Sequence, residues 1–148
     1  MKPTFQLVLA AAICATATLA ADKPMRLEDM PAIVQKTIRD ETKGAKITGT
    51  LTEVEDGKTL YEVETVVNGH TRDFLVNALG TVVEVEEGVS VGSVPGPVKA
   101  AVEKAASGGK LTKLERVKRG ETVTYEASVL KDGKKTGMEL RPDGSRIK

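Results

Sequence analysis

The chain has 148 residues, 29% of them charged, and a formal net charge of +1 at pH 7. Two tyrosines, two phenylalanines and no tryptophan leave few stacking platforms for nucleic-acid bases or sugar rings. Charge is uneven along the chain, with thirteen acidic and six basic side chains in residues 28–92 but seven and thirteen in residues 93–148. A nucleic-acid-binding protein would need one continuous basic surface, so nucleic acid is not expected as a partner. Three interpretations of this uneven charge remain open. The two halves attract each other, they present two faces to a partner, or the charged faces are simply solvated.

Residues 1–21 have the features of a secretory signal peptide. An early lysine is followed by an apolar run that is too short to span a bilayer, and then by small residues. Cleavage is expected after Ala20 or Ala21. An isoleucine precedes Cys14, where a lipoprotein signal would need a small residue, so this cysteine is expected to leave with the signal. We therefore expect a periplasmic or secreted protein without stable membrane insertion after cleavage.

The remaining chain contains an internal repeat with an offset of 64 residues. This offset aligns Pro31 with Pro95, Tyr61 with Tyr125 and Gly80 with Gly144. Most of the matching positions are glycines, prolines or apolar residues with core spacing, which indicates a shared fold rather than a shared active site. We predict one repeat over residues 28–91 and a second over residues 92–148.

The sequence pattern of each repeat predicts one helix followed by four strands. The helices begin at Pro31 and Pro95, because a missing N–H costs nothing in the first turn of a helix. In the first repeat the strands are expected at residues 47–55, 60–67, 71–77 and 82–86, with Asn68-Gly69 as a hairpin turn. The predicted fold class is α+β, with two tandem modules, each one helix packed on a four-stranded antiparallel meander. The first strand of each repeat alternates poorly, which predicts a β-bulge there.

Alternation of side chains assigns two faces to each predicted sheet. Tyr61 and Tyr125 belong to the faces that the helices should cover. The opposite face of the first repeat carries five acidic residues and no basic residue at those strand positions: Glu62, Glu64, Asp73, Glu84 and Glu86. This is the candidate partner-binding face, because it would attract a basic protein patch by long-range steering. A solubilising face is the alternative.

Several segments of the first repeat resemble a PepSY domain. They are the segment Met-Pro-Ala-Ile-Val-Gln-Lys-Thr-Ile from Met30, Gly-Ala-Lys-Ile from Gly44, Asp-Gly-Lys-Thr-Leu-Tyr-Glu-Val-Glu from Asp56, and Leu-Gly-Thr-Val from Leu79. The second repeat is a looser match, and the tandem arrangement resembles PepSY-like proteins grouped with the β-lactamase-inhibitor fold. The resemblance implies an exported, non-catalytic module that binds or restrains a protein such as a secreted or envelope enzyme. The related β-lactamase inhibitors use disulfides and aromatic-rich surfaces, which this chain lacks, so no functional residue is carried over.

The sequence lacks the usual equipment for catalysis. Its one histidine, His70, follows a hairpin turn, a mobile place that is poorly suited to a general base. No zinc-ligand set, calcium loop or phosphate-binding loop occurs in the sequence. We therefore expect no catalytic, cofactor-binding or metal-binding residues. The alternatives are a cation- or ligand-sensing envelope protein that uses the acidic face of the first repeat, and an enzyme of unrecognised type.

Overall fold

The structure is a computed structural model, and it describes residues 23–147. The predicted signal peptide, residues 1–21, lies outside the described residues. Among the described helices, none is both long and apolar enough to cross a membrane.

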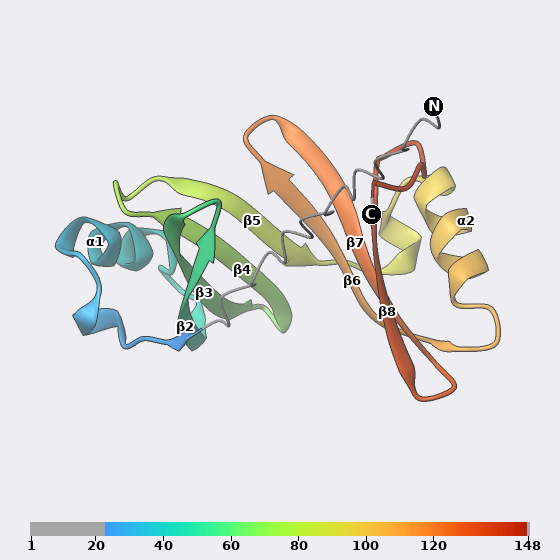
Figure 1. Ribbon diagram of the computed structural model, residues 1–148, viewed down its shortest axis with the longest axis horizontal. Helices are drawn as coiled ribbons and strands as arrows, with labels where there is room; N and C mark the ends of the chain where they lie inside the picture. The colour runs from blue at the N-terminus through green and yellow to red at the C-terminus, as the bar shows by residue number, and fades with distance from the viewer. Residues whose placement is uncertain (1–22, 148) are drawn as a thin grey trace, which may run out of the picture.

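Eight antiparallel strands form one sheet in which each strand is hydrogen-bonded to its neighbours in the sequence (Figure 1). The strands are β1 (Lys23–Pro24), β2 (Lys46–Glu55), β3 (Lys58–Val67), β4 (His70–Asn77), β5 (Val82–Gly88), β6 (Lys110–Arg119), β7 (Thr122–Lys131) and β8 (Lys134–Leu140). Short 3₁₀ turns, η1 (Leu27–Asp29) and η2 (Val91–Ser93), precede the two helices. These helices are α1 (Ala32–Glu41), between β1 and β2, and α2 (Gly96–Ala105), between β5 and β6.

The prediction of an α+β fold with two tandem modules, each one helix packed on a four-stranded meander, is wrong; whether the two sheets join into one could not be told from the sequence. Strand β5 pairs with β6, from Val85 opposite Lys118 to Gly88 opposite Glu115, so that one mostly β sheet runs through both halves. The predicted last strand of the second repeat is reduced to an isolated bridge between Leu140 and Arg146. Side-chain alternation is a local signal and cannot show which strand edges meet. Pairing β5 with β6 satisfies backbone groups that two separate sheets would each leave exposed at an edge.

Both helices cover the same face of this sheet. Val85 on β5 pairs with Lys118 on β6, which in turn pairs with Val123 on β7. Paired residues of neighbouring strands point to the same side of a sheet, so these three side chains share one face. Val85 packs against the core under α1, and Val123 packs against the core under α2. The opposite face of the sheet therefore carries no helix, and we call it the helix-free face.

Two separate hydrophobic cores lie between the sheet and the helices. The first core contains Met30, Val34, Ile38, Tyr61, Val63, Phe74 and Val76. The second contains Val94, Val98, Val102, Leu114, Tyr125, Ala127, Val129, Met138 and Leu140. Tyr61 and Tyr125 are each only 8% exposed, which confirms their predicted burial in the core.

The predicted bulges are present in the first long strand of each half. The pairing of β2 with β3 shifts between Ile47 and Gly49, and that of β6 with β7 shifts between Leu111 and Lys113. A bulge adds one residue to a strand, which explains why apolar and polar residues do not alternate there.

Candidate functional site

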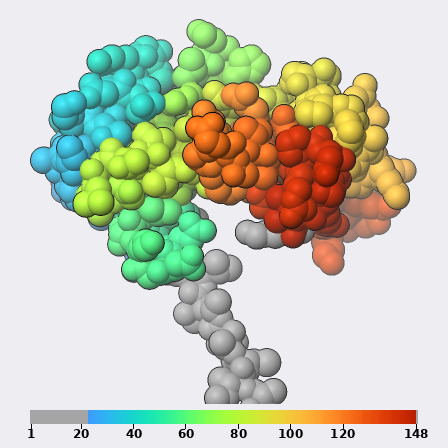
Figure 2. All heavy atoms as spheres, turned by 90° about the horizontal axis from the view of Figure 1, so that it is seen from above, coloured from blue at the N-terminus to red at the C-terminus, as the bar shows by residue number. Residues whose placement is uncertain are grey.

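The helix-free face concentrates acidic side chains near the middle of the sheet. Strand register and alternation place nine carboxylates and two cationic side chains there: Glu53, Glu62, Glu64, Asp73, Glu84, Glu86, Lys113, Glu115, Arg119, Glu126 and Glu139. Figure 2 shows the surface hollowed on the side away from the two helices, between the two halves of the sheet. The middle of this face is therefore strongly negative and lies in a concave part of the molecule.

All five sequence-predicted site residues lie on this face. Glu62 is directly opposite Leu75, which in turn is opposite Glu84, and Asp73 is opposite Glu86. Glu64 follows Glu62 by two residues on the same strand, so alternation puts it on the same side. Their role as a partner-binding face stays a prediction.

Sequence reasoning missed the part of the face that the second half contributes. Strand β6 brings Lys113, Glu115 and Arg119 against the acidic residues of the first half, and β7 and β8 add Glu126 and Glu139. The available signal was the uneven charge of the two halves together with alternation along residues 110–119. It became informative only once β5 was known to pair with β6.

Arg119 is the main counter-charge on this face. Its guanidinium lies 2.5 Å from a carboxylate oxygen of Glu84, 2.8 Å from one of Glu139 and 3.6 Å from one of Glu126. The hydroxyl of Thr124 donates a hydrogen bond to the same Glu139 oxygen, at 2.9 Å. Because the side chains of Glu84 and Glu139 are 13% and 9% exposed, these ion pairs are well shielded from water.

A further ion pair joins the acidic half to the basic half. Arg116 contacts Glu87 at 2.5 Å on the helix-covered side of the same seam between β5 and β6. With the Arg119–Glu84 pair, it shows that opposite charges of the two halves meet at this seam.

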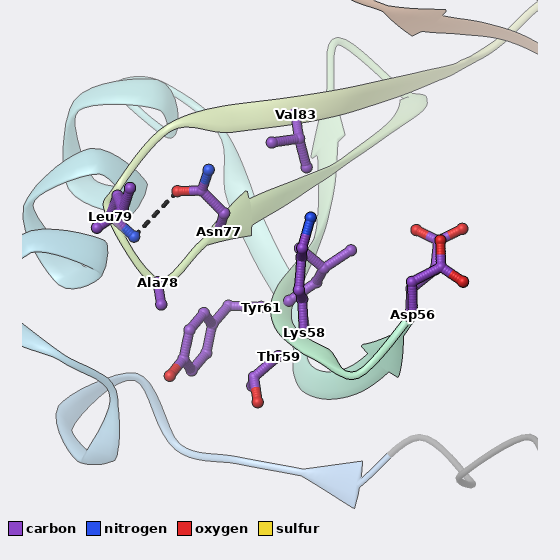
Figure 3. A pocket seen from close by; sticks show the side chains of 10 residues that line it. Asp56, Lys58, Thr59, Tyr61, Asn77, Ala78, Leu79 and Val83 are labelled. Carbon is purple, nitrogen blue, oxygen red and sulfur yellow. Dashed lines mark hydrogen bonds between the residues drawn. The ribbon is translucent and has the colours of Figure 1, made fainter.

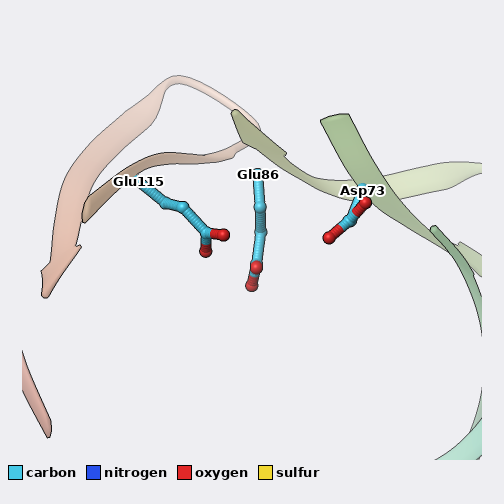
Figure 4. A group of neighbouring side chains, drawn as sticks. All are labelled: Asp73, Glu86 and Glu115. Atoms are coloured by element: carbon cyan, nitrogen blue, oxygen red, sulfur yellow. The ribbon is translucent and has the colours of Figure 1, made fainter. Parts of the chain in front are cut away.

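Three carboxylates of β4, β5 and β6 form a compact group on the helix-free face (Figure 4). Asp73, Glu86 and Glu115 each offer an oxygen, and these oxygens lie within 4.8 Å of one another. Oxygen ligands of this kind suit a hard divalent cation, so these are the residues that could hold one. Lys113 already places its ammonium 2.6 Å from Glu115 and 3.6 Å from Glu86, so the chain supplies its own cation here.

Burial and neighbouring negative charges raise the pKa values of several of these carboxylates. Burial, reinforced by Glu53, Glu64 and other carboxylates, raises the pKa of Glu62 to about 7. Burial is also the main cause of the raised pKa values of Asp73 and Glu115. The backbone N–H of Thr65 donates a hydrogen bond to Asp73 at 3.0 Å, which opposes this rise only in part.

A second surface feature is an open groove of about 650 Å³ beside the start of β3 and the β4–β5 turn (Figure 3). Its walls include Tyr61, Val83 and the largely exposed Leu79. The backbone N–H of Leu79 donates a hydrogen bond to the side-chain oxygen of Asn77, which shapes the turn. The groove is lined by the β2–β3 turn, the start of β3 and the β4–β5 turn, and it shares no residue with the acidic group of Asp73, Glu86 and Glu115.

No family model matches the chain, and no curated protein matches it. Solved structures do share its fold. A protein of Bacteroides eggerthii, provisionally described as periplasmic, is 19% identical with a TM-score of 0.66, over 80% of this chain and 86% of that one. A DUF2874 family protein of Bacteroides uniformis is 19% identical with a TM-score of 0.63, over 80% of this chain and 86% of that one. A BLIP-like protein of Bacteroides fragilis is 15% identical with a TM-score of 0.57, over 80% of this chain and 84% of that one. At these identities the likeness shows the fold alone.

Proposed function

We propose that this chain is a non-catalytic binding module of the periplasm, and that its helix-free face docks a protein with a basic patch. The observation that carries the proposal is the charge in the central part of that face, where nine carboxylates share two cationic side chains. Glu55 and four further lysines, Lys46, Lys58, Lys110 and Lys135, lie on the same side nearer the ends of their strands. The predicted signal peptide at residues 1–21 and fold neighbours provisionally described as periplasmic, or as BLIP-like, support the location and the binding role. The PepSY resemblance makes a secreted or envelope enzyme the favoured class of partner.

The electrostatics of the face favour a cationic protein over other partners. An excess of like charge in a hollow focuses the field outward and speeds the approach of a positively charged surface. The same field repels the phosphates of nucleic acids and of anionic lipids. Docking would add the counter-charges that Arg119 and Lys113 do not supply to Glu62 and Glu64.

We also propose that residues 28–91 and 92–148 are two copies of one ancestral unit. The helices begin 64 residues apart, at Ala32 and Gly96, and the two bulges lie at matching positions of β2 and β6. The second copy has only an isolated bridge where the first copy has its fourth strand, and the sheet ends at β8.

The proposal is tested by neutralising charge on the face without changing its shape. A partner captured from envelope extract is identified, and its association rate is measured with the double variant Glu62→Gln, Glu64→Gln. The control is Glu103→Gln, Glu121→Gln, which also replaces two glutamates by glutamine but lies on α2 and in the β6–β7 turn. We expect the first variant alone to associate more slowly and to depend less on salt. Equal association rates for both variants would refute docking at this face.

A cation-sensing role is the second candidate, favoured by the 4.8 Å grouping of Asp73, Glu86 and Glu115. The two functions differ in their response to calcium. A sensor would be stabilised against heat by millimolar calcium in the wild type, and more strongly in Lys113→Met, where the competing ammonium is gone. A protein-docking face requires no such response.

A further inference from the structure

Glu62 occupies an unusual place on the helix-free face. The residues directly opposite it are Leu51 on β2 and Leu75 on β4, and Leu75 is only 7% exposed. Its carboxylate is thus flanked by apolar side chains in the middle of a sheet and is partly withdrawn from water. None of the ion pairs found among residues 23–147 includes Glu62.

The charged groups that face Glu62 are overwhelmingly of its own sign. Those on its own and adjacent strands, and on β5, are Glu53, Glu55, Glu64, Asp73, Glu84 and Glu86, with Lys46 and Lys58 at the starts of β2 and β3. The more distant part of the face holds Lys113, Glu115, Arg119, Glu126 and Glu139. The two cations of this second group are engaged with other carboxylates, at 2.6 Å from Glu115 for Lys113 and 2.5 Å from Glu84 for Arg119. Glu62 therefore meets partial desolvation and like-charge repulsion together.

Both effects favour the neutral carboxylic acid over the carboxylate. They raise the pKa of Glu62 to about 7, which is near the pH of neutral buffers. A basic partner on this face would act in the opposite sense, because a nearby positive charge favours the ionised form. Partner docking and proton release are then linked in both directions.

We propose that Glu62 is a proton-exchanging residue of the helix-free face, protonated in part of the free protein at neutral pH and ionised when a basic partner docks. Docking would then strengthen as the pH rises from 6 to 8. This regulation rests on the docking function proposed above. It assigns to Glu62 a role that the acidic residues paired with Lys113 or Arg119, such as Glu84 and Glu115, do not share.

The titration itself is measured without any partner. Carboxyl carbons of ¹³C-labelled glutamate are followed by NMR between pH 3 and pH 9, and the variant Glu62→Gln identifies the resonance of Glu62. We expect the Glu62 resonance to shift with a midpoint near pH 7. A midpoint below about pH 5, where ordinary glutamates titrate, would overturn the inference and leave the docking proposal untouched.

The linkage is measured with a fluorescent decalysine peptide at low salt, because lysine side chains keep their charge between pH 6 and pH 8. If docking lowers the pKa of Glu62 by one unit, the peptide should bind about fivefold more weakly at pH 6 than at pH 8. In Glu62→Gln the affinity should be the same at both values. Equal affinities in the protein that retains Glu62 would overturn proton exchange while docking stands. Failure of the peptide to bind at either pH would overturn the docking proposal and this inference together.

Discussion

Replacing Arg119 by methionine should destabilise the fold far more than replacing its neighbour Arg116. The methylene stem and most of the packing are kept in both variants, so the comparison isolates the guanidinium. Arg119 serves three carboxylates, of which those of Glu84 and Glu139 are 13% and 9% exposed. Arg116 serves Glu87 alone, and both partners of this pair are more than a third exposed, at 48% and 37%.

The magnitude follows from this difference in exposure. Removing one partner of a buried ion pair costs roughly 3–5 kcal/mol, because the remaining charge is left desolvated. The side chain of Arg119 is itself 40% exposed, so solvent screening reduces the expected loss to about 2–3 kcal/mol. For the exposed pair of Arg116 the expected loss is about 0–1 kcal/mol.

Urea unfolding at pH 7 provides the measurement, with the midpoint and slope compared between the two variants. Adding Glu139→Gln to Arg119→Met should recover part of the loss, because it removes one of the carboxylates that the guanidinium had neutralised. If Arg119→Met costs no more than Arg116→Met, the helix-free face is more open to water than the structure indicates, and the reasoning about Glu62 would fall with it.

Two further predictions concern the cores and the turns. Tyr61→Ala and Tyr125→Ala should each lower the free energy of unfolding by about 3 kcal/mol, because each residue is 8% exposed beneath a helix. Variants that unfold at the same urea concentration as the wild type would contradict the assigned faces. Gly80→Ala should cost about 2–3 kcal/mol, since its φ is +80° and a Cβ there would lie 2.6 Å from Cγ1 of Ile33. Gly57→Ala, with a φ of +73° and nothing within 4 Å, should cost only about 1 kcal/mol, and equal losses would argue against the close approach of α1 to the β4–β5 turn.

Much of the local structure could be predicted from the sequence. The strand predicted at residues 47–55 is observed as β2 (Lys46–Glu55), and the Asn68-Gly69 turn joins β3 to β4, with Asn68 at a φ of +51°. Turn residues and side-chain alternation act over a few residues, so the chain reveals them without knowledge of its fold. The same alternation placed the five acidic residues of the first half on one face.

The pairing of β5 with β6 could not be predicted in this way. Residues Val85 and Lys118 are separated along the chain by α2, and nothing local distinguishes a sheet that ends at β5 from one that continues into β6. The sequence therefore predicted the elements correctly in large part, grouped them into two modules, and left open whether the two sheets join into one.

The candidate site shows the same division. Alternation alone determined that Glu62 lies with other carboxylates away from the helix. Only the tertiary structure decided that Arg119 and Lys113 reach this face and neutralise Glu84 and Glu115, because they arrive on β6. The burial that makes Glu62 reluctant to ionise likewise depends on its neighbours across the sheet, since the charge state of a carboxylate is set by the solvent and charges around it rather than by its position in the chain.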